Sequence, residues 1–70
     1  MTWIETPESS NIVRFGYDAS NSTLGVEFKS GGVYQYFDVP EGVFEQMKNA
    51  ASKGKFLAQH IKGTFRYARV

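Results

Sequence analysis

The sequence predicts an α+β domain: a three-stranded antiparallel meander followed by two short C-terminal helices on one face of the sheet (β-β-β-α-α). Three runs rich in β-branched and aromatic residues lie within residues 11–39, separated by short segments of Gly, Ser and Asn. After Pro40, apolar residues recur at helical spacing instead. The chain of 70 residues has the length of one domain, and six Phe, four Tyr and one Trp must supply most of its core.

The predicted strands follow one another closely. NIVRFGYD (11–18) is the first, TLGVEFK (23–29) alternates apolar and polar residues as the second, and VYQYFDV (33–39) is the third. Connections as short as 19–22 and 30–32 join antiparallel neighbours. We expect residues 1–10 to form an N-terminal arm, which leaves residues 11–70 as a single domain.

The face occupied by Tyr34 and Tyr36 depends on the turn before them. A two-residue Gly31-Gly32 loop would pair Phe28 with Gln35 and place both tyrosines outside. A three-residue loop beginning at residue 30 would pair Phe28 with Tyr34 and place both on the core face. The second register is favoured because a buried glutamine would need partners for its amide, whereas tyrosine can keep its hydroxyl at the rim.

Two helices are expected after the third strand. Asp38 can cap the first, with Pro40 in its first turn, Glu41 three residues after the cap, and Met47 among the apolar residues that follow. The second helix is predicted from about Lys53 to Lys62, with Gly63 just beyond its end. Its apolar stripe consists of Phe56, Leu57, His60 and Ile61. The last segment, 64–70, alternates and is expected to return as a strand or to form an extended tail.

The composition argues against several kinds of active site. The chain contains no cysteine and one histidine, so disulfides and thiolate metal sites are excluded, and a transition-metal site lacks ligands. His60 lies on the predicted apolar stripe, and we expect it to be semi-buried and hydrogen-bonded. No nucleophile elbow or glycine-rich phosphate loop is present. The chain is therefore expected to be no enzyme and to use no cofactor.

Charge is divided along the chain. Residues 1–47 hold all seven acidic residues and two basic ones, whereas residues 48–70 hold six basic residues and no acid. This asymmetry indicates either a basic face for a polyanion or a basic segment that docks beside the acidic part of its own fold. For the first case, cations interleaved with aromatic rings are typical of single-stranded RNA binding. The candidate residues are Lys53, Lys55, Lys62, Arg66, Tyr67 and Arg69.

Several short motifs together resemble the KTSC domain family. They are SSN at 9–11, GYD at 16–18, LGVEF at 24–28, GGVYQY at 31–36, VP at 39–40, SKGKF at 52–56 and IKG at 61–63. The resemblance covers residues 9–70 and implies a bacterial domain that occurs alone or at the C-terminus of some lysyl-tRNA synthetases. It also implies a Tyr-x-Tyr signature, present as Tyr34 and Tyr36, and makes RNA a proposed partner. The family's usual Tyr-Pro-Tyr-Arg-Arg-like ending is replaced by FRYAR.

These observations lead to two functional hypotheses. The first is a small binding domain that engages RNA or another polyanion through its basic C-terminal third. The alternative is a protein–protein interaction module, possibly a homodimer, that uses the aromatic sheet surface or an exposed sheet edge. The opening residues do not resemble a signal peptide, and no segment approaches the roughly 18 apolar residues of a membrane helix, so we expect a cytoplasmic protein with no membrane partner.

Overall fold

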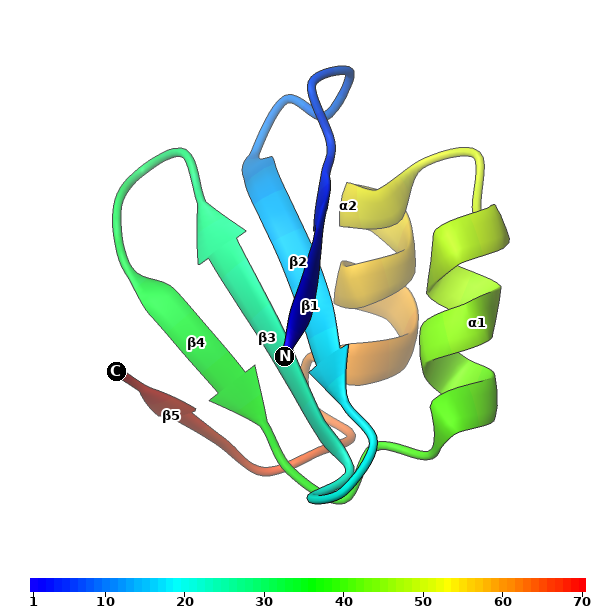
Figure 1. Cartoon of the computed structure of the whole chain (residues 1–70). Coiled ribbons are helices and arrows are strands. Elements are labelled where there is room, and N and C mark those ends of the chain that lie inside the picture. Colours follow the sequence, from blue (N-terminus) through cyan, green and yellow to red (C-terminus); the bar gives the residue numbers. More distant parts are fainter.

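The computed structural model describes residues 1–70 and contains one antiparallel sheet in the order β1-β2-β3-β4-β5 (Figure 1). The strands are β1 (Thr2–Glu5), β2 (Ile12–Asp18), β3 (Thr23–Phe28), β4 (Val33–Tyr36) and β5 (Tyr67–Arg69). Between β4 and β5 lie α1 (Glu41–Asn49), α2 (Lys53–Phe56) and the π-helical turn η1 (Leu57–Ile61). The prediction of an α+β domain is confirmed, but the sheet has five strands and not three.

The first additional strand comes from the segment expected to be an arm. β1 pairs with β2, so that Trp3 lies opposite Gly16 and Ile4 opposite Phe15. Trp3 packs on the outer face, where a Cβ at Gly25 would lie only 2.9 Å from its ring. The glycine at position 25 therefore leaves room for the Trp3 ring to lie close over β3.

The β3–β4 register places both tyrosines on the core face, as the favoured register predicted. The pairing itself differs, because Tyr36 lies opposite Leu24 and Tyr34 opposite Val26. Phe28 instead closes the loop by donating its backbone N–H to the carbonyl of Gly32 (3.1 Å). The connection is thus longer than either predicted turn, and a shift by two residues leaves the face unchanged.

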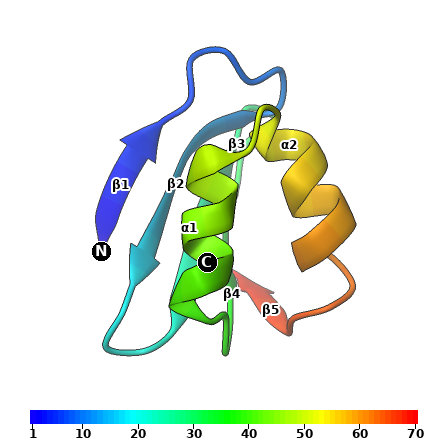
Figure 2. The ribbon, with the colours of Figure 1, turned by 90° about the vertical axis from the view of Figure 1, so that its right-hand side faces the viewer.

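A β-bulge in β2 completes the core. Ile12 pairs with Phe28 and Arg14 with Glu27, so one extra residue lies between them on β2. The bulge brings Ile12 onto the same face as Phe15, and both side chains are fully buried. Helices α1, α2 and η1 lie together beside the sheet (Figure 2). They contribute Phe44, Met47, Leu57 and Ile61 to the same core.

Two details of the helices differ from prediction. Asp38 does not cap α1: the helix begins after Pro40 without a side-chain cap, and Asp38 adopts a positive φ of 58°. Its carboxylate pairs instead with Arg66 at 2.8 Å. His60 is exposed and not semi-buried, with its ring 4.7 Å from that of Phe56. A π-helical turn is wider than an α-helical turn, which rotates this residue away from the stripe formed by Leu57 and Ile61.

Candidate nucleic-acid interface

The helices leave part of the sheet's core face uncovered. β4 and β5 form the side of the molecule farthest from α1 (Figure 1). Here a cleft of about 450 Å³ opens between β4, β5, the β3–β4 loop and the end of η1. We call it the tyrosine cleft, and it is lined by Phe28, Ser30, Gly31, Tyr34, Tyr36, Lys62, Gly63 and Tyr67.

Three tyrosine rings form a row that runs from the core to the surface of this cleft. Tyr36 is buried, with 3% of its surface exposed, Tyr34 is half-buried, and Tyr67 on β5 is 61% exposed. β5 brings Tyr67 directly opposite Tyr36. The Tyr67 ring centroid lies 5.8 Å from those of Tyr34 and Tyr36, at interplanar angles of 45° and 39°. Tyr67 is tilted relative to both rings and does not stack on either. Because it is also largely exposed, it presents aromatic surface to the solvent.

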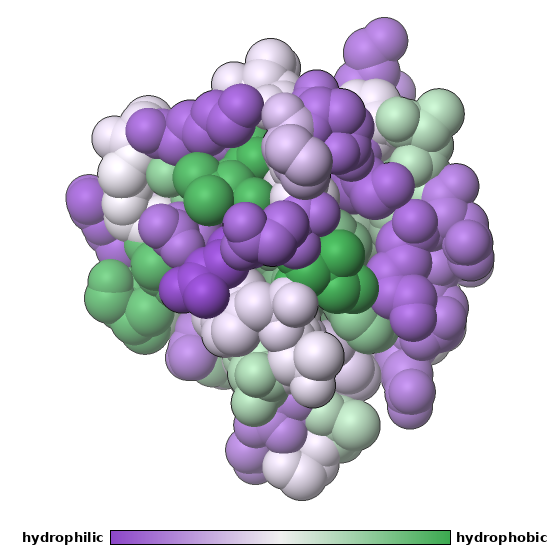
Figure 3. Space-filling model, turned by 45° about the horizontal axis from the view of Figure 1, so that its top comes forward, coloured by the Kyte–Doolittle hydropathy of each residue, from purple (hydrophilic) through white to green (hydrophobic).

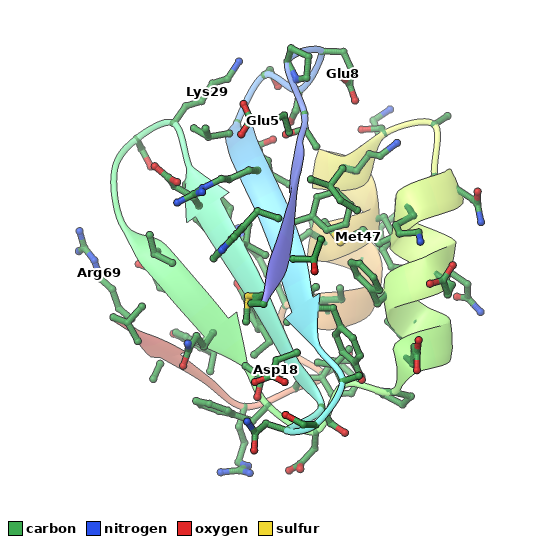
Figure 4. The ribbon with its side chains drawn as sticks, in the orientation of Figure 1. Glu5, Glu8, Asp18, Lys29, Met47 and Arg69 are labelled. Carbon is green, nitrogen blue, oxygen red and sulfur yellow. The ribbon has the colours of Figure 1, made fainter.

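Two cations border the tyrosine cleft. The Nζ of Lys62 lies 5.1 Å from the centroid of Phe28, and the guanidinium carbon of Arg69 lies 6.0 Å from that of Tyr34. Arg69 also lies against Gly32, where a Cβ would come within 2.9 Å of its Nε. Figure 4 shows Arg69 on β5, at the edge of the sheet far from Met47. Neither Lys62 nor Arg69 forms an ion pair, so both charges are available to a ligand.

The tyrosine cluster also changes the acidity of its most buried member. Burial raises the pKa of Tyr36 above its usual range, and the nearby phenols of Tyr67 and Tyr34 raise it further. A tyrosine is neutral near pH 7 in any case, and the raised pKa keeps Tyr36 protonated to a higher pH than an exposed tyrosine. The positive charge at the cleft comes from Lys62 and Arg69, which border it.

The six residues predicted for a nucleic-acid site do not form one cluster. Lys62 and Tyr67 line the tyrosine cleft, and Arg69 borders it. Arg66 points elsewhere, since its guanidinium pairs with Asp38 and lies 5.6 Å from the Phe37 ring. The pairing partly supports the alternative that basic residues dock beside acidic ones of the same fold.

Lys53 and Lys55 belong to a second cleft at the start of α2. Residues 8–11 of the β1–β2 loop and residues 51–55 and 58 line this cleft, which has a volume of about 530 Å³. Ser52 caps α2, with its hydroxyl accepting from the backbone N–H of Lys55 (3.3 Å). The Lys53 ammonium donates to the Ala50 carbonyl at 3.0 Å. Lys55 has no ion-pair partner.

This second cleft is polar. Figure 3 views the molecule with the β1–β2 loop tilted forward, and its surface there is largely hydrophilic, with apolar atoms in small separate areas. Glu8 also lines the cleft, so a carboxylate accompanies its two lysines. The second cleft therefore lacks both the aromatic rings and the purely positive border of the tyrosine cleft.

Sequence reasoning did not place Phe28, Tyr34 and Tyr36 in the site. The Tyr-x-Tyr spacing did put the tyrosines on one face, but it could not show that helices cover only part of that face. The signal that could have identified them is the alternation of 64–70, because a strand there must pair with β4 and extend the same face.

Two further features, a metal site and a membrane-spanning helix, are absent from the structure. No group of three His, Cys, Asp or Glu side chains lies close enough to hold a metal ion. None of the helices has the length and apolar character that crossing a bilayer requires.

Comparison with known proteins identifies a matching family profile, related sequences and a related crystal structure. The profile of the KTSC domain matches residues 8–65. Lysine–tRNA ligases of Trichormus variabilis and Nostoc punctiforme are each 45% identical over 64 residues, which are 91% of this chain. The chain spans only 11% of the length of these ligases.

Shorter relatives are matched over most of their length. An uncharacterised protein of Stutzerimonas stutzeri is 38% identical over 90% of both chains. The crystal structure of a KTSC domain protein from Yersinia pestis superposes with a TM-score of 0.93 at 36% identity. The superposition covers 99% of this chain and 96% of that one. The fold described above therefore makes up nearly the whole of that crystallised chain.

Proposed function

This chain belongs to the KTSC domain family, and we propose that it is a non-catalytic domain that binds RNA or a related polyanion. The observation that carries the proposal is the tyrosine cleft, in which the exposed Tyr67 ring lies beside the unpaired cations Lys62 and Arg69. Proteins that bind single-stranded nucleic acid combine these elements: cations contact phosphates and aromatic rings stack on bases.

The distribution of ion pairs supports this proposal. Among the basic residues after residue 47, Lys48 pairs with Glu45 and Arg66 with Asp38, whereas Lys53, Lys55, Lys62 and Arg69 have no acidic partner. Their charges are not neutralised within the fold. A nearby polyanion would release counterions on meeting them, which is the main source of affinity in such complexes.

The relatives make RNA the most suitable polyanion to test. The ligases that contain this domain are named for an RNA, tRNA, and the matched region is a small part of each. A similar domain occurs both within such an enzyme and in short chains. This distribution is consistent with an RNA-binding unit that functions in either setting.

Charge reversal tests the proposal directly. We expect the chain to bind total RNA at low salt, and the Lys62→Glu/Arg69→Glu variant to lose that binding while its circular dichroism stays unchanged. Lys48→Glu is the matched control, because Lys48 lies on α1 and already pairs with Glu45. The Lys53→Glu/Lys55→Glu variant measures the contribution of the second cleft. RNA binding that survives both double reversals would refute an electrostatic interface.

One observation favours a second function, a protein–protein interaction module. β1 and β5 are the two edges of the sheet, and neither edge is covered by another strand. Open edges can pair with a strand of another chain, including a second copy. We expect such a module to show twice the monomer mass in sedimentation experiments at high concentration. A monomeric mass throughout would exclude the homodimer.

A further inference from the structure

We infer that the tyrosine cleft holds a single unstacked nucleobase, with Tyr67 as its stacking partner and Lys62 and Arg69 on its flanking phosphates. This inference rests on the proposed RNA binding and specifies its ligand: an unpaired base with the adjoining backbone. A domain with this pocket differs from proteins that contact only the phosphates of a polyanion, because it also contacts a base.

The size and lining of the tyrosine cleft fit a base. Its volume of about 450 Å³ lies within the range of small-molecule sites, roughly 300–1,000 Å³. Half of its lining residues are apolar or aromatic, and the others are Ser30, Lys62 and two glycines. A planar ring with polar edges matches such a lining. Bases within a duplex are paired and stacked, so they could not enter.

Tyr67 has the position required of a stacking residue. It is 61% exposed although it lies on a strand, and its backbone is held in register opposite Tyr36. The rings of Tyr34 and Tyr36 contact it at a tilt, which leaves room for a parallel neighbour on its open side. The buried Tyr36 ring and the half-buried Tyr34 ring limit how far a base can enter.

The two cations border the same aromatic cluster from different elements. Lys62 lies over Phe28 and Arg69 over Tyr34, and the centroids of these two rings are 5.4 Å apart. The cations therefore lie over adjacent rings of the same aromatic cluster. Lys62 comes from the end of η1 and Arg69 from β5, so a strand of nucleic acid would cross between these two elements.

Two glycines lie at the mouth of the tyrosine cleft. Gly31 and Gly63 both line it and both have positive φ, 98° and 82°. A Cβ at either position would meet no atom within 4 Å, so it is the backbone conformation and not crowding that requires glycine. Each loop thus has one turn position beside the cleft that carries no side chain, although Ser30 and Lys62 next to these glycines also line it.

The test compares oligonucleotides that differ in their bases. Fluorescence anisotropy at low salt would measure binding of a uridine octamer, an abasic octamer with the same backbone, a DNA octamer of the same sequence and an RNA duplex. We expect the uridine octamer to bind more tightly than the abasic and duplex probes. Tyr67→Ala should weaken its binding by roughly 5- to 140-fold, the range for one base–aromatic stack.

Matched variants separate stacking from other effects. Tyr67→Phe should retain binding because the ring remains, and Tyr67→Leu should lose it although apolar bulk remains. His60→Ala, which removes an exposed aromatic ring outside the cleft, should have no effect. The DNA octamer should depend on Tyr67 in the same way, since the faces of its bases are equally available for stacking.

The outcomes distinguish this inference from the proposed function. Equal binding of the uridine and abasic octamers, or Tyr67→Leu binding like the unaltered chain, would overturn the base pocket and leave polyanion binding intact. Tight binding of the duplex, or a DNA octamer indifferent to Tyr67, would likewise overturn it. Failure of every probe to bind would refute the proposed function itself.

Discussion

The salt dependence of RNA binding should report how many cations contact phosphates. For single strands, the logarithm of the binding constant falls with the logarithm of salt concentration with a slope of about −0.7 for each phosphate neutralised. If Lys62 and Arg69 are the only contacts, the slope is about −1.4. If Lys53 and Lys55 also contact the strand, the slope is about −2.8.

These slopes correspond to measurable differences. Between about 50 and 200 mM salt, affinity would fall roughly 7-fold with two contacts and roughly 50-fold with four. Fluorescence anisotropy of a labelled uridine octamer, repeated at four or five salt concentrations, determines the slope. Because the two clefts lie at different ends of the α2–η1 helix, the slope shows whether the octamer contacts one cleft or both.

Neutral variants test the assignment without introducing repulsion. Lys62→Gln and Arg69→Gln should each reduce the magnitude of the slope by about 0.7. Lys48→Gln should leave it unchanged, because Lys48 is paired with Glu45 on α1. A slope that is unaltered in the Lys62→Gln/Arg69→Gln double variant, or one that falls equally in Lys48→Gln, would refute the placement of the phosphates.

Three further predictions concern stability, measured by urea denaturation. The folded pKa of Tyr36 is raised, so the stability that its neutral form contributes is complete below the unfolded value of about 10 and is lost as pH rises through the folded value. Tyr36→Phe should therefore lose less stability than the unaltered chain as the pH is raised above about 10, and an equal loss in both would contradict this. Met47→Ala should lower the free energy of unfolding by about 2–5 kcal/mol, since the side chain is fully buried, whereas no loss would mean that the site collapses around the cavity. Gly31→Ala should cost about 1–2 kcal/mol through its positive φ, and an unchanged midpoint would show that the loop can relax.

The sequence predicted the three central strands because they depend on local alternation, and it favoured the core face for the tyrosines because a buried glutamine would need partners for its amide. It missed β1 because its four residues follow no long apolar pattern, and their place depends on pairing with β2 and on the fit of Trp3 beside Gly25. It also predicted the wrong pairing for Tyr34, since the length of the β3–β4 connection depends on the Phe28–Gly32 hydrogen bond. Such features arise from contacts between distant or folded segments, which a pattern in one segment cannot specify.

The candidate site was predicted in part for the same reason. Charge and aromatic content identified Lys62, Tyr67 and Arg69, which the structure brings to one cleft. The same composition also included Arg66, whose partner Asp38 is 28 residues away in sequence. An ion pair between residues so far apart is visible only once β5 and the end of β4 are side by side. Asp38 itself was misassigned as a helix cap for this reason.

The tyrosines also show how one face of a small sheet can serve two purposes. Exposure increases from Tyr36 at 3% through the half-buried Tyr34 to Tyr67 at 61%, so the same row of rings is core at one end and surface at the other. A helical layer that covered all five strands would have buried this row and left no cleft. The two short helices pack on the central strands. The aromatic surface on β4 and β5, on which the proposed function depends, therefore reaches the solvent at Tyr67.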